Sequence, residues 1–238
     1  MARKRGRASR CPTFNEDRNE RIELARKKHV EIIPRNVNQE RFLALLEDDD
    51  INICFAVGPA GTGKTMISTL FSIHMLQESL IDKIVITRPN VPVDNKDIGF
   101  LPGGIMEKMA PWTKPILDIF EEFYSPKQIQ QMMEDGLIEI CPIAYIRGRT
   151  FKNAIVLVDE AQGTTKNSML SILTRIGEGS KIIVTGDIDQ SDHGHNNGLH
   201  DFLCRYQQSD HIKMVCFNYQ DVERHPVVKE VLRLYNME

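Results

Sequence analysis

The feature that most constrains the fold is the run Gly-Pro-Ala-Gly-Thr-Gly-Lys-Thr at residues 58–65. It follows an apolar stretch at 51–57 and leads into residues 64–79, where apolar side chains recur at helical spacing. Glycines allow the backbone to curl so that successive N–H groups face one point, and a helix start adds positive partial charge there. A strand, a glycine-rich turn and a helix in this order predict a phosphate-binding loop, a P-loop. The alternative is a glycine-rich turn that binds nothing.

The side chains at the end of the run indicate which ligand the loop takes. Lys64 supplies a positive charge for the β- and γ-phosphates, and the Thr65 hydroxyl is a ligand for Mg²⁺. We therefore expect ATP with Mg²⁺ as the bound group, with Lys64 also counted among the catalytic residues. The candidate nucleotide-binding residues of the loop are Gly58, Pro59, Ala60, Gly61, Thr62, Gly63, Lys64 and Thr65.

Short apolar runs alternate with helical patterns along the rest of the chain. The pattern predicts an α/β fold with a mostly parallel sheet and helices on both faces. Strands are expected at 51–57, 83–87, 137–141, 154–158, 181–185 and 213–217. Helices are expected at 38–47, 64–79, 105–135 with a break near Ser125, 165–176, 197–207 and 226–236. No internal repeat interrupts this order, so we expect a single domain over residues 20–238.

Composition limits the cellular setting. The hydrophobic share of 41% and the charged share of 26% are ordinary, and a net charge of −3 carries no polycationic signature. Five cysteines without a C-x-x-C pair favour reduced thiols, and neither a membrane-spanning run nor a signal peptide is evident. We expect a cytoplasmic protein that does not enter a membrane.

The first residues have a charge of their own. A cluster without acidic residues consists of Arg3, Lys4, Arg5, Arg7 and Arg10. We interpret residues 1–19 as a disordered basic tail, and a nucleic-acid-binding arm is the alternative.

An acidic pair follows the apolar run at 154–158. Asp159 and Glu160 stand at the carboxyl end of that predicted strand, the edge at which open α/β sheets bind ligands. Asp159 is the candidate Mg²⁺ ligand beside Thr65, and Glu160 is the candidate base that orients and deprotonates water. A surface acidic pair that closes a strand is the alternative, but the P-loop upstream favours the functional interpretation. A base for water favours a hydrolase over a transferase acting on a small molecule.

Further polar residues lie at the same predicted edge. The run Thr185-Gly186-Asp187 ends another strand and is followed by Gln190, so Asp187 is a candidate for sensing the γ-phosphate. Gln162 closes the run Asp-Glu-Ala-Gln and is included among the nucleotide-binding candidates. An ordinary strand–turn is the alternative for the run Thr185-Gly186-Asp187.

Taken together, these motifs resemble the PhoH family and occur in its order over about residues 30–236. The matching stretches are Gly58–Thr65, Thr87–Pro89, Gly99–Gly103, Ala144–Thr150, Asp159–Gln162, Thr164–Thr165, Leu173–Gly177, Thr185–Asp187, Ser191–Asp192 and Arg224–Val228. The resemblance implies a RecA-like P-loop NTPase domain, similar to the first motor domain of superfamily 1 helicases. It implies ATP hydrolysis, action on RNA or other single-stranded nucleic acid, and assembly into rings, often hexamers.

The chain departs from the family pattern in two respects. Gly163 stands where family members commonly carry Asn, and no fused RNA-binding or nuclease domain is evident. Compact versions of this kind resemble those carried by bacteriophages. Gln39 precedes the P-loop strand, as the adenine-reading glutamine does in helicase-like proteins, and a solvated helix residue is the alternative.

Helicases of this type place ATP between two RecA-like domains, and the second domain supplies an arginine to the γ-phosphate. With one such domain expected, we predict that a neighbouring subunit supplies it. The candidates are Arg147, Arg149, Arg175 and Arg224, of which Arg175 and Arg224 are favoured as catalytic residues. Ordinary surface salt bridges are the alternative for each.

Three functions remain open at this point. The first is a nucleic-acid-stimulated ATPase or helicase, and the second is an ATP-binding regulatory or assembly module that hydrolyses slowly and works through a protein partner. The third is a small-molecule kinase, which Glu160 disfavours because it suits water activation. For His193 and His195, a polar loop is favoured over a zinc site because no cysteine ligands lie nearby.

Overall fold

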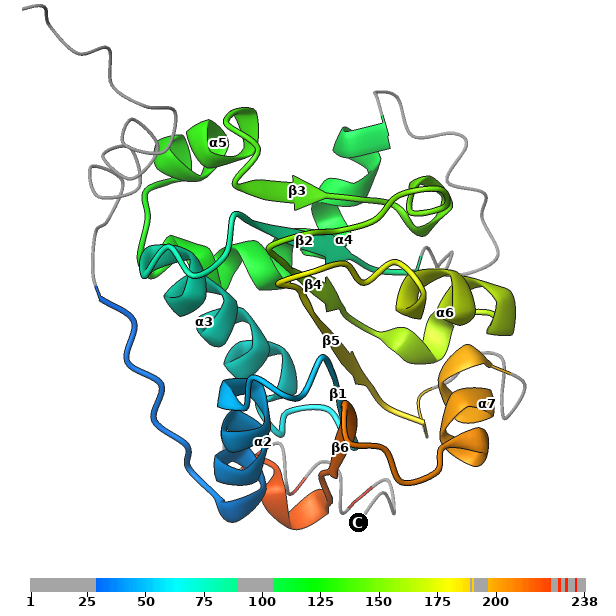
Figure 1. Cartoon of the computed structure of the whole chain (residues 1–238). Coiled ribbons are helices and arrows are strands. Elements are labelled where there is room, and N and C mark those ends of the chain that lie inside the picture. Colours follow the sequence, from blue (N-terminus) through cyan, green and yellow to red (C-terminus); the bar gives the residue numbers. More distant parts are fainter. Residues whose placement is uncertain are drawn as a thin grey trace, which may run out of the picture.

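Six parallel strands form the centre of the structure, a computed structural model that describes residues 29–89, 105–188, 190, 197–223, 227, 230 and 234. The strands are β1 (Ile53–Val57), β2 (Lys83–Thr87), β3 (Ile138–Ile140), β4 (Ala154–Val158), β5 (Lys181–Gly186) and β6 (Ile212–Cys216). They lie in the order β3-β2-β4-β5-β1-β6, and each pairing is parallel (Figure 1). The predicted strands at 83–87 and 154–158 coincide with β2 and β4, and the predicted parallel sheet is confirmed.

Helices connect the strands in the expected places. They are α2 (Val37–Glu47), α3 (Lys64–Gln77), α4 (Ile105–Glu121), α5 (Pro126–Glu134), α6 (Lys166–Leu173) and α7 (Gly198–Arg205), with single 3₁₀ turns η3 (Ile143–Tyr145), η4 (Ala161–Gly163) and η5 (Tyr219–Asp221). In the described part of the chain, no helix has the length and apolar character needed to cross a membrane. The predicted basic tail at 1–19 lies outside the described residues, as does most of the predicted helix at 226–236.

Two helix ends differ from, or sharpen, the sequence prediction. The break near Ser125 is real, because the Ser125 hydroxyl and the Gln128 side chain cap each other's backbone N–H groups at the start of α5. Helix α6 ends at Leu173, three residues before its predicted end at 176. The reason is that Ile176 instead forms a parallel bridge with Phe151.

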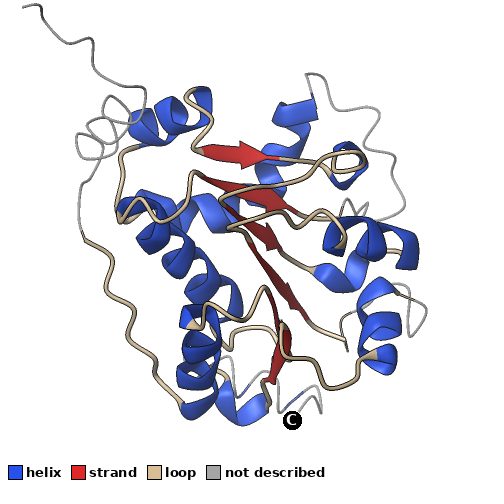
Figure 2. Ribbon diagram, viewed as in Figure 1, coloured by secondary structure: helices blue, strands red, loops and turns tan. Residues whose placement is uncertain are grey.

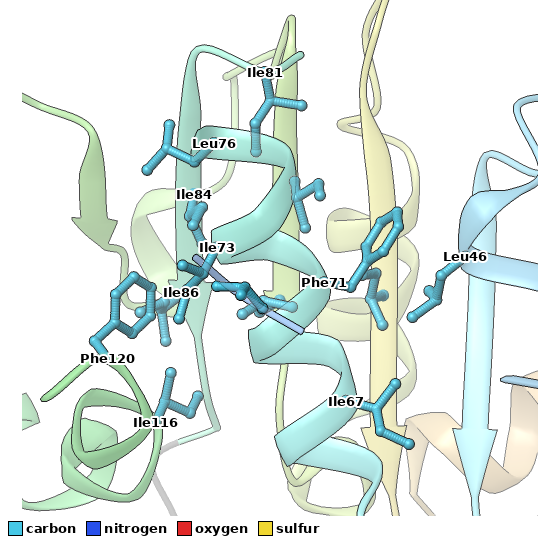
Figure 3. Close-up of a cluster of buried hydrophobic side chains, with 14 of the residues drawn as sticks. Leu46, Ile67, Phe71, Ile73, Leu76, Ile81, Ile84, Ile86, Ile116 and Phe120 are labelled. Atoms are coloured by element: carbon cyan, nitrogen blue, oxygen red, sulfur yellow. The ribbon is translucent and has the colours of Figure 1, made fainter. Parts of the chain in front are cut away.

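Alternate residues of each strand are buried on opposite faces of the sheet. In β1, Cys54 and Ala56 join the core that holds α2, α3, α4 and α5, while Phe55 joins the core that holds α6 and α7. Figure 2 shows the two helical layers on either side of the strands. Figure 3 shows the first core, in which Ile73 of α3 lies near Ile84 and Ile86 of β2. Burial of each such side chain contributes about 1.5–3 kcal/mol, which explains why the strands read as continuous apolar runs.

Strand β5 lies between β1 and β4. It therefore sets the spacing between the carboxyl ends of β1 and β4. The P-loop follows β1, the acidic pair follows β4, and Thr185 lies near the end of the strand between them. All three polar segments meet at the carboxyl edge because the strands are parallel. The result is an α/β fold with a parallel sheet between two helical layers, as the sequence predicts.

Gly58 fixes the first turn of the P-loop against two neighbouring strands. Its N–H donates to the carbonyl of Gly186 at 3.1 Å, and its φ of 143° is one that side-chain-bearing residues rarely adopt. A Cβ at this position would lie 2.3 Å from the carbonyl oxygen of Phe217, just after β6. The loop therefore enters through a gap that only glycine fits.

We predict that Gly58→Ala lowers the free energy of unfolding by about 2–4 kcal/mol, because it combines backbone strain with a clash against backbone atoms. Gly136→Ala is the matched control: its φ is +74°, but no atom lies within 4 Å of the added Cβ. The control should lose only about 1–2 kcal/mol. Urea denaturation of both variants measures the difference, and equal losses would show that the contact with Phe217 does not matter.

Candidate nucleotide-binding site

The P-loop surrounds the ammonium group of Lys64. This side chain is only 8% exposed, and its Nζ donates to the carbonyls of Gly58 at 2.7 Å and Pro59 at 2.6 Å. Thr62 is fully buried, and its hydroxyl donates to the same Pro59 carbonyl at 3.0 Å. Gly63, in the left-handed region at φ 87°, ends the loop and caps α3. Positive charge and the N-terminal end of α3 thus lie together, which is the chemistry that nucleotide phosphates require.

Asp159 joins three elements at the base of this loop. Its Oδ1 accepts hydrogen bonds from the Thr65 hydroxyl at 2.8 Å and from the Thr185 hydroxyl at 2.6 Å. The Asp159 residue is 5% exposed, so the carboxylate lies at the inner wall of the site. The sequence prediction paired Thr65 with Asp159, and the structure brings them into contact. Hydroxyl and carboxylate oxygens are the hard ligands that Mg²⁺ prefers, so these residues fit that ion.

Arg88 forms ion pairs with both residues of the acidic pair, and the sequence motifs assigned it no role. Its guanidinium lies 3.5 Å from Asp159 Oδ2 and 3.4 Å from Glu160 Oε1. The Trp112 carbonyl accepts a hydrogen bond from Arg88 Nη1 at 2.8 Å and so holds the guanidinium in place. The available signal was positional: Arg88 directly follows β2, the strand beside β4, and therefore reaches the same edge. Trp112 thus contributes through its backbone carbonyl.

Glu160 has a strained backbone and a partly exposed side chain. Its φ of 53° lies in the left-handed region, where a non-glycine residue costs on the order of 1 kcal/mol. Its carboxylate is 42% exposed and accepts a short hydrogen bond from Gln162 Nε2. Gln162 Oε1 in turn accepts the backbone N–H of Asp187 at 3.0 Å. The amide of Gln162 therefore links the end of β4 to the end of β5.

A pocket of about 220 Å³ lies between the P-loop and the acidic pair. Its lining residues are Ala60, Gly61, Gly63, Lys64, Thr65, Met66, Asp159, Glu160, Thr185, Gly186, Asp187 and Gln190. Asp187 and Gln190, expected near the γ-phosphate, are thus brought to the pocket. Their roles toward a nucleotide stay predictions.

Gln39 lies behind the P-loop and is 1% exposed. Its Nε2 donates to the Thr62 carbonyl at 3.0 Å, and its Oε1 accepts the N–H of Arg35 at 2.8 Å. A Cβ on Gly63 would lie 2.7 Å from Nε2, so the amide packs directly against the loop. Gln39 is therefore a buried support for the loop and not a solvated helix residue. Its reading of an adenine stays a prediction.

Arg147, Arg149 and Arg175, the candidate arginines within the described residues, do not line this pocket. Arg175 and Arg147 line a separate surface hollow beside Leu170, and Arg175 Nη1 donates to the Arg149 carbonyl at 3.5 Å. Arg149 forms a two-pronged ion pair with Glu139, which holds the pKa of that carboxyl below its ordinary value. The Arg149 guanidinium is thus already engaged within its own chain. Arg224, His193 and His195 lie outside the described residues.

A model of the family described as PhoH-like protein matches residues 31–236. The PhoH-like protein of Synechocystis sp. is 38% identical over 215 residues, covering 89% of this chain and 65% of the relative. Protein PhoH of Escherichia coli K12 is 39% identical over 209 residues, covering 86% of this chain and 58% of the relative. The chain therefore spans about 58–65% of the length of these two relatives.

Among solved structures, the large terminase of a thermophilic bacteriophage matches with a TM-score of 0.49 and 12% identity. The match covers 85% of this chain and 51% of the terminase. The family match, by contrast, extends over most of the chain and includes the P-loop and the acidic pair. The resemblance seen in the sequence motifs is confirmed, and the chain belongs to the PhoH-like protein family.

Proposed function

We propose that this chain binds ATP with Mg²⁺ and hydrolyses it in the pocket between the P-loop and the acidic pair. The observation that carries the proposal is the 2.8 Å hydrogen bond from the Thr65 hydroxyl to Asp159 Oδ1. It places the two oxygen groups suited to Mg²⁺ side by side, within one pocket that also holds Lys64 and Glu160. A glycine-rich turn that binds nothing would not need a carboxylate partner for Thr65.

Each residue takes a distinct part in the proposed reaction. Lys64 and the backbone N–H groups at the start of α3 bind the β- and γ-phosphates. Thr65 and Asp159 hold Mg²⁺, which offsets negative charge on the phosphate oxygens. Glu160 orients a water molecule and accepts its proton as the water oxygen bonds to the γ-phosphorus and the bond to the leaving ADP oxygen breaks. Arg88, which forms ion pairs with both carboxylates, positions them relative to each other.

The link through Gln162 supports a role for Asp187 in the same cycle. Gln162 bonds Glu160 through Nε2 and the Asp187 backbone through Oε1. A shift of Glu160 toward water therefore changes a hydrogen bond at the end of β5. We infer that this strand end reports the state of the γ-phosphate.

Substitutions at Lys64 and Glu160 separate binding from hydrolysis. We expect Lys64→Ala to lose nucleotide binding, because the positive charge within the loop is removed. We expect Glu160→Gln to bind a fluorescent ATP analogue within about threefold of wild type while its turnover falls by about 10²–10⁴-fold. Phosphate release, measured with and without single-stranded RNA, gives the rates. Glu47→Gln, which alters an exposed carboxylate at the end of α2, is the control.

The same assay decides among the competing functions. Absence of turnover in the wild-type protein with and without RNA would contradict the proposal and favour an ATP-binding regulatory module with a protein partner. Transfer of phosphate to a metabolite instead of water would favour a kinase.

A second hollow supports the part of the proposal that concerns nucleic acid. It has a volume of about 480 Å³ and lies between η3, the end of η4 and the start of α6. Arg147 lines it together with the exposed hydroxyls of Thr165 and Ser168. Tyr145, at the end of η3, is 56% exposed. A cation, hydroxyls and a helix start suit a phosphate backbone, and an exposed aromatic ring suits base stacking, so we propose single-stranded RNA as the occupant.

We predict that Arg147→Ala weakens the binding of a labelled single-stranded RNA by about tenfold at moderate salt. It should also reduce the slope of log K against log salt by about 0.7, the contribution of one phosphate contact. Fluorescence anisotropy across a salt series gives both values. Arg41→Ala, an exposed arginine on α2, should leave affinity and slope unchanged. Wild-type affinity in Arg147→Ala would place the RNA elsewhere.

We further propose that the active unit is a ring of identical chains, in which a neighbour contributes the arginine that stabilises transition-state charge. The support is the position of Arg175, which lies outside the pocket of its own chain. It lines a surface hollow with Leu170, whose side chain is 63% exposed. An arginine beside an exposed apolar side chain is typical of a protein interface.

Mixing two inactive variants tests the ring. Lys64→Ala lacks a working loop, and Arg175→Ala lacks the proposed arginine. If the arginine acts between chains, an equal mixture should recover roughly a quarter of the wild-type turnover, because a random quarter of interfaces joins an intact loop to an intact arginine. The same mixture made with Arg224→Ala tests the other candidate. Failure of both mixtures to recover activity would contradict these two arginines acting in trans.

A further inference from the structure

The chain segment ahead of α2 is docked against the carboxyl end of α3. Val30 is 3% exposed, and its N–H donates to Gln77 Oε1 at 3.3 Å. Gln77 Nε2 also donates to the Tyr124 hydroxyl at 3.0 Å, which ties the contact to the loop after α4. Figure 1 shows this blue segment leading from the region of the carboxyl end of α3 to α2. The position of His29, next to Val30, is therefore set by buried contacts.

Three side chains of types that can bind a metal ion meet at this junction. His74 and Glu78 stand one turn apart at the end of α3, and His29 approaches from the docked segment. Their ligand atoms all lie within 4.8 Å of one another. His29 Nδ1 lies 3.9 Å from Glu78 Oε1, and the two imidazole rings meet edge to face with centroids 5.9 Å apart. The cluster lies at the opposite end of α3 from the P-loop.

His74 supplies an independent observation. Its Nδ1 is buried and has no hydrogen-bond partner among the described residues. Buried polar atoms are seldom left in this state, and a metal ion is one partner that satisfies an imidazole nitrogen. The carbonyl end of a helix also carries negative partial charge, which favours a cation there.

We propose that His29, His74 and Glu78 bind a divalent transition-metal ion of the zinc class. Two imidazoles and one carboxylate are a ligand set that this class favours over Mg²⁺ or Ca²⁺, and water fills the fourth position. Tetrahedral coordination requires ligand atoms about 3.3 Å apart. His29 and Glu78, with side chains 57% and 41% exposed, have room to rotate inward toward His74. The bound ion fastens the segment ahead of α2 to the end of α3, independently of the nucleotide pocket.

Cobalt is the probe for this site, because tetrahedral Co²⁺ absorbs strongly in visible light whereas octahedral Co²⁺ absorbs weakly. The full chain, free of nucleotide and with excess Mg²⁺ to occupy the P-loop pocket, is titrated with Co²⁺ and then with Zn²⁺. We expect one equivalent of tetrahedral Co²⁺ that Zn²⁺ displaces. His74→Gln and Glu78→Gln should each weaken Co²⁺ binding by at least tenfold.

His211→Gln is the matched control, because this histidine contacts the carbonyl of Asp50 and lies outside the cluster. It should bind Co²⁺ as the wild type does. A second readout is thermal unfolding: saturating Zn²⁺ should raise the Tm of the wild type and the control, but not that of His74→Gln. Should His74→Gln fail to fold, Glu78→Gln carries the test alone. The proposal is overturned by the absence of saturable one-to-one binding, or by wild-type affinity in the folded variants.

Discussion

One carboxylate oxygen, Oδ1 of Asp159, accepts hydrogen bonds from hydroxyls on two other elements and thereby fixes the site. Thr65 reaches it from α3 at 2.8 Å, and Thr185 reaches it from β5 at 2.6 Å. Two short bonds to a charged acceptor in a nearly buried position are stronger than bonds between neutral groups. They require the carboxyl ends of β1, β5 and β4 to lie level with one another. The geometry of the pocket therefore depends on the strand order of the sheet. A change in the register of β5 would separate the loop from the acidic pair.

The fold followed from patterns that act over short stretches of chain. Buried parallel strands must be apolar on both faces, and for that reason β2 and β4 were identified at their observed bounds. Helix α6 ended earlier than its apolar spacing predicted, because Ile176 pairs with Phe151 across more than twenty residues of sequence. Periodicity within a segment carries no information about such a partner. The strand order was also beyond the sequence, since β5 inserts between β1 and β4 although both precede it in the chain.

The candidate site was also predictable only in part from local sequence patterns. Loop and acidic residues were identifiable because their spacing follows from the chemistry of phosphate and magnesium. Arg88 was missed because its meaning depends on β2 lying next to β4, a relation visible only in the assembled sheet. Gln39 shows the complementary case: its position in sequence suggests contact with a base, which stays a prediction, and only the structure shows that its amide also bonds the chain itself. A buried amide bonded at both ends makes the curvature of the P-loop depend on the start of α2.

That dependence connects the nucleotide pocket to the remainder of the chain. Residues 29–36 lead into α2, and the Arg35 N–H bonds Gln39, which bonds the Thr62 carbonyl of the loop. These two hydrogen bonds couple the position of this segment to that of the P-loop. Val30 holds the other end of the segment against the carboxyl end of α3. Helix α3 begins at Lys64 and ends beside His29. The helix and the segment 29–36 therefore connect the same two regions, the P-loop and the carboxyl end of α3. These contacts at both ends of α3 oppose rotation of the helix about its axis and hold its first turn in place beside the P-loop.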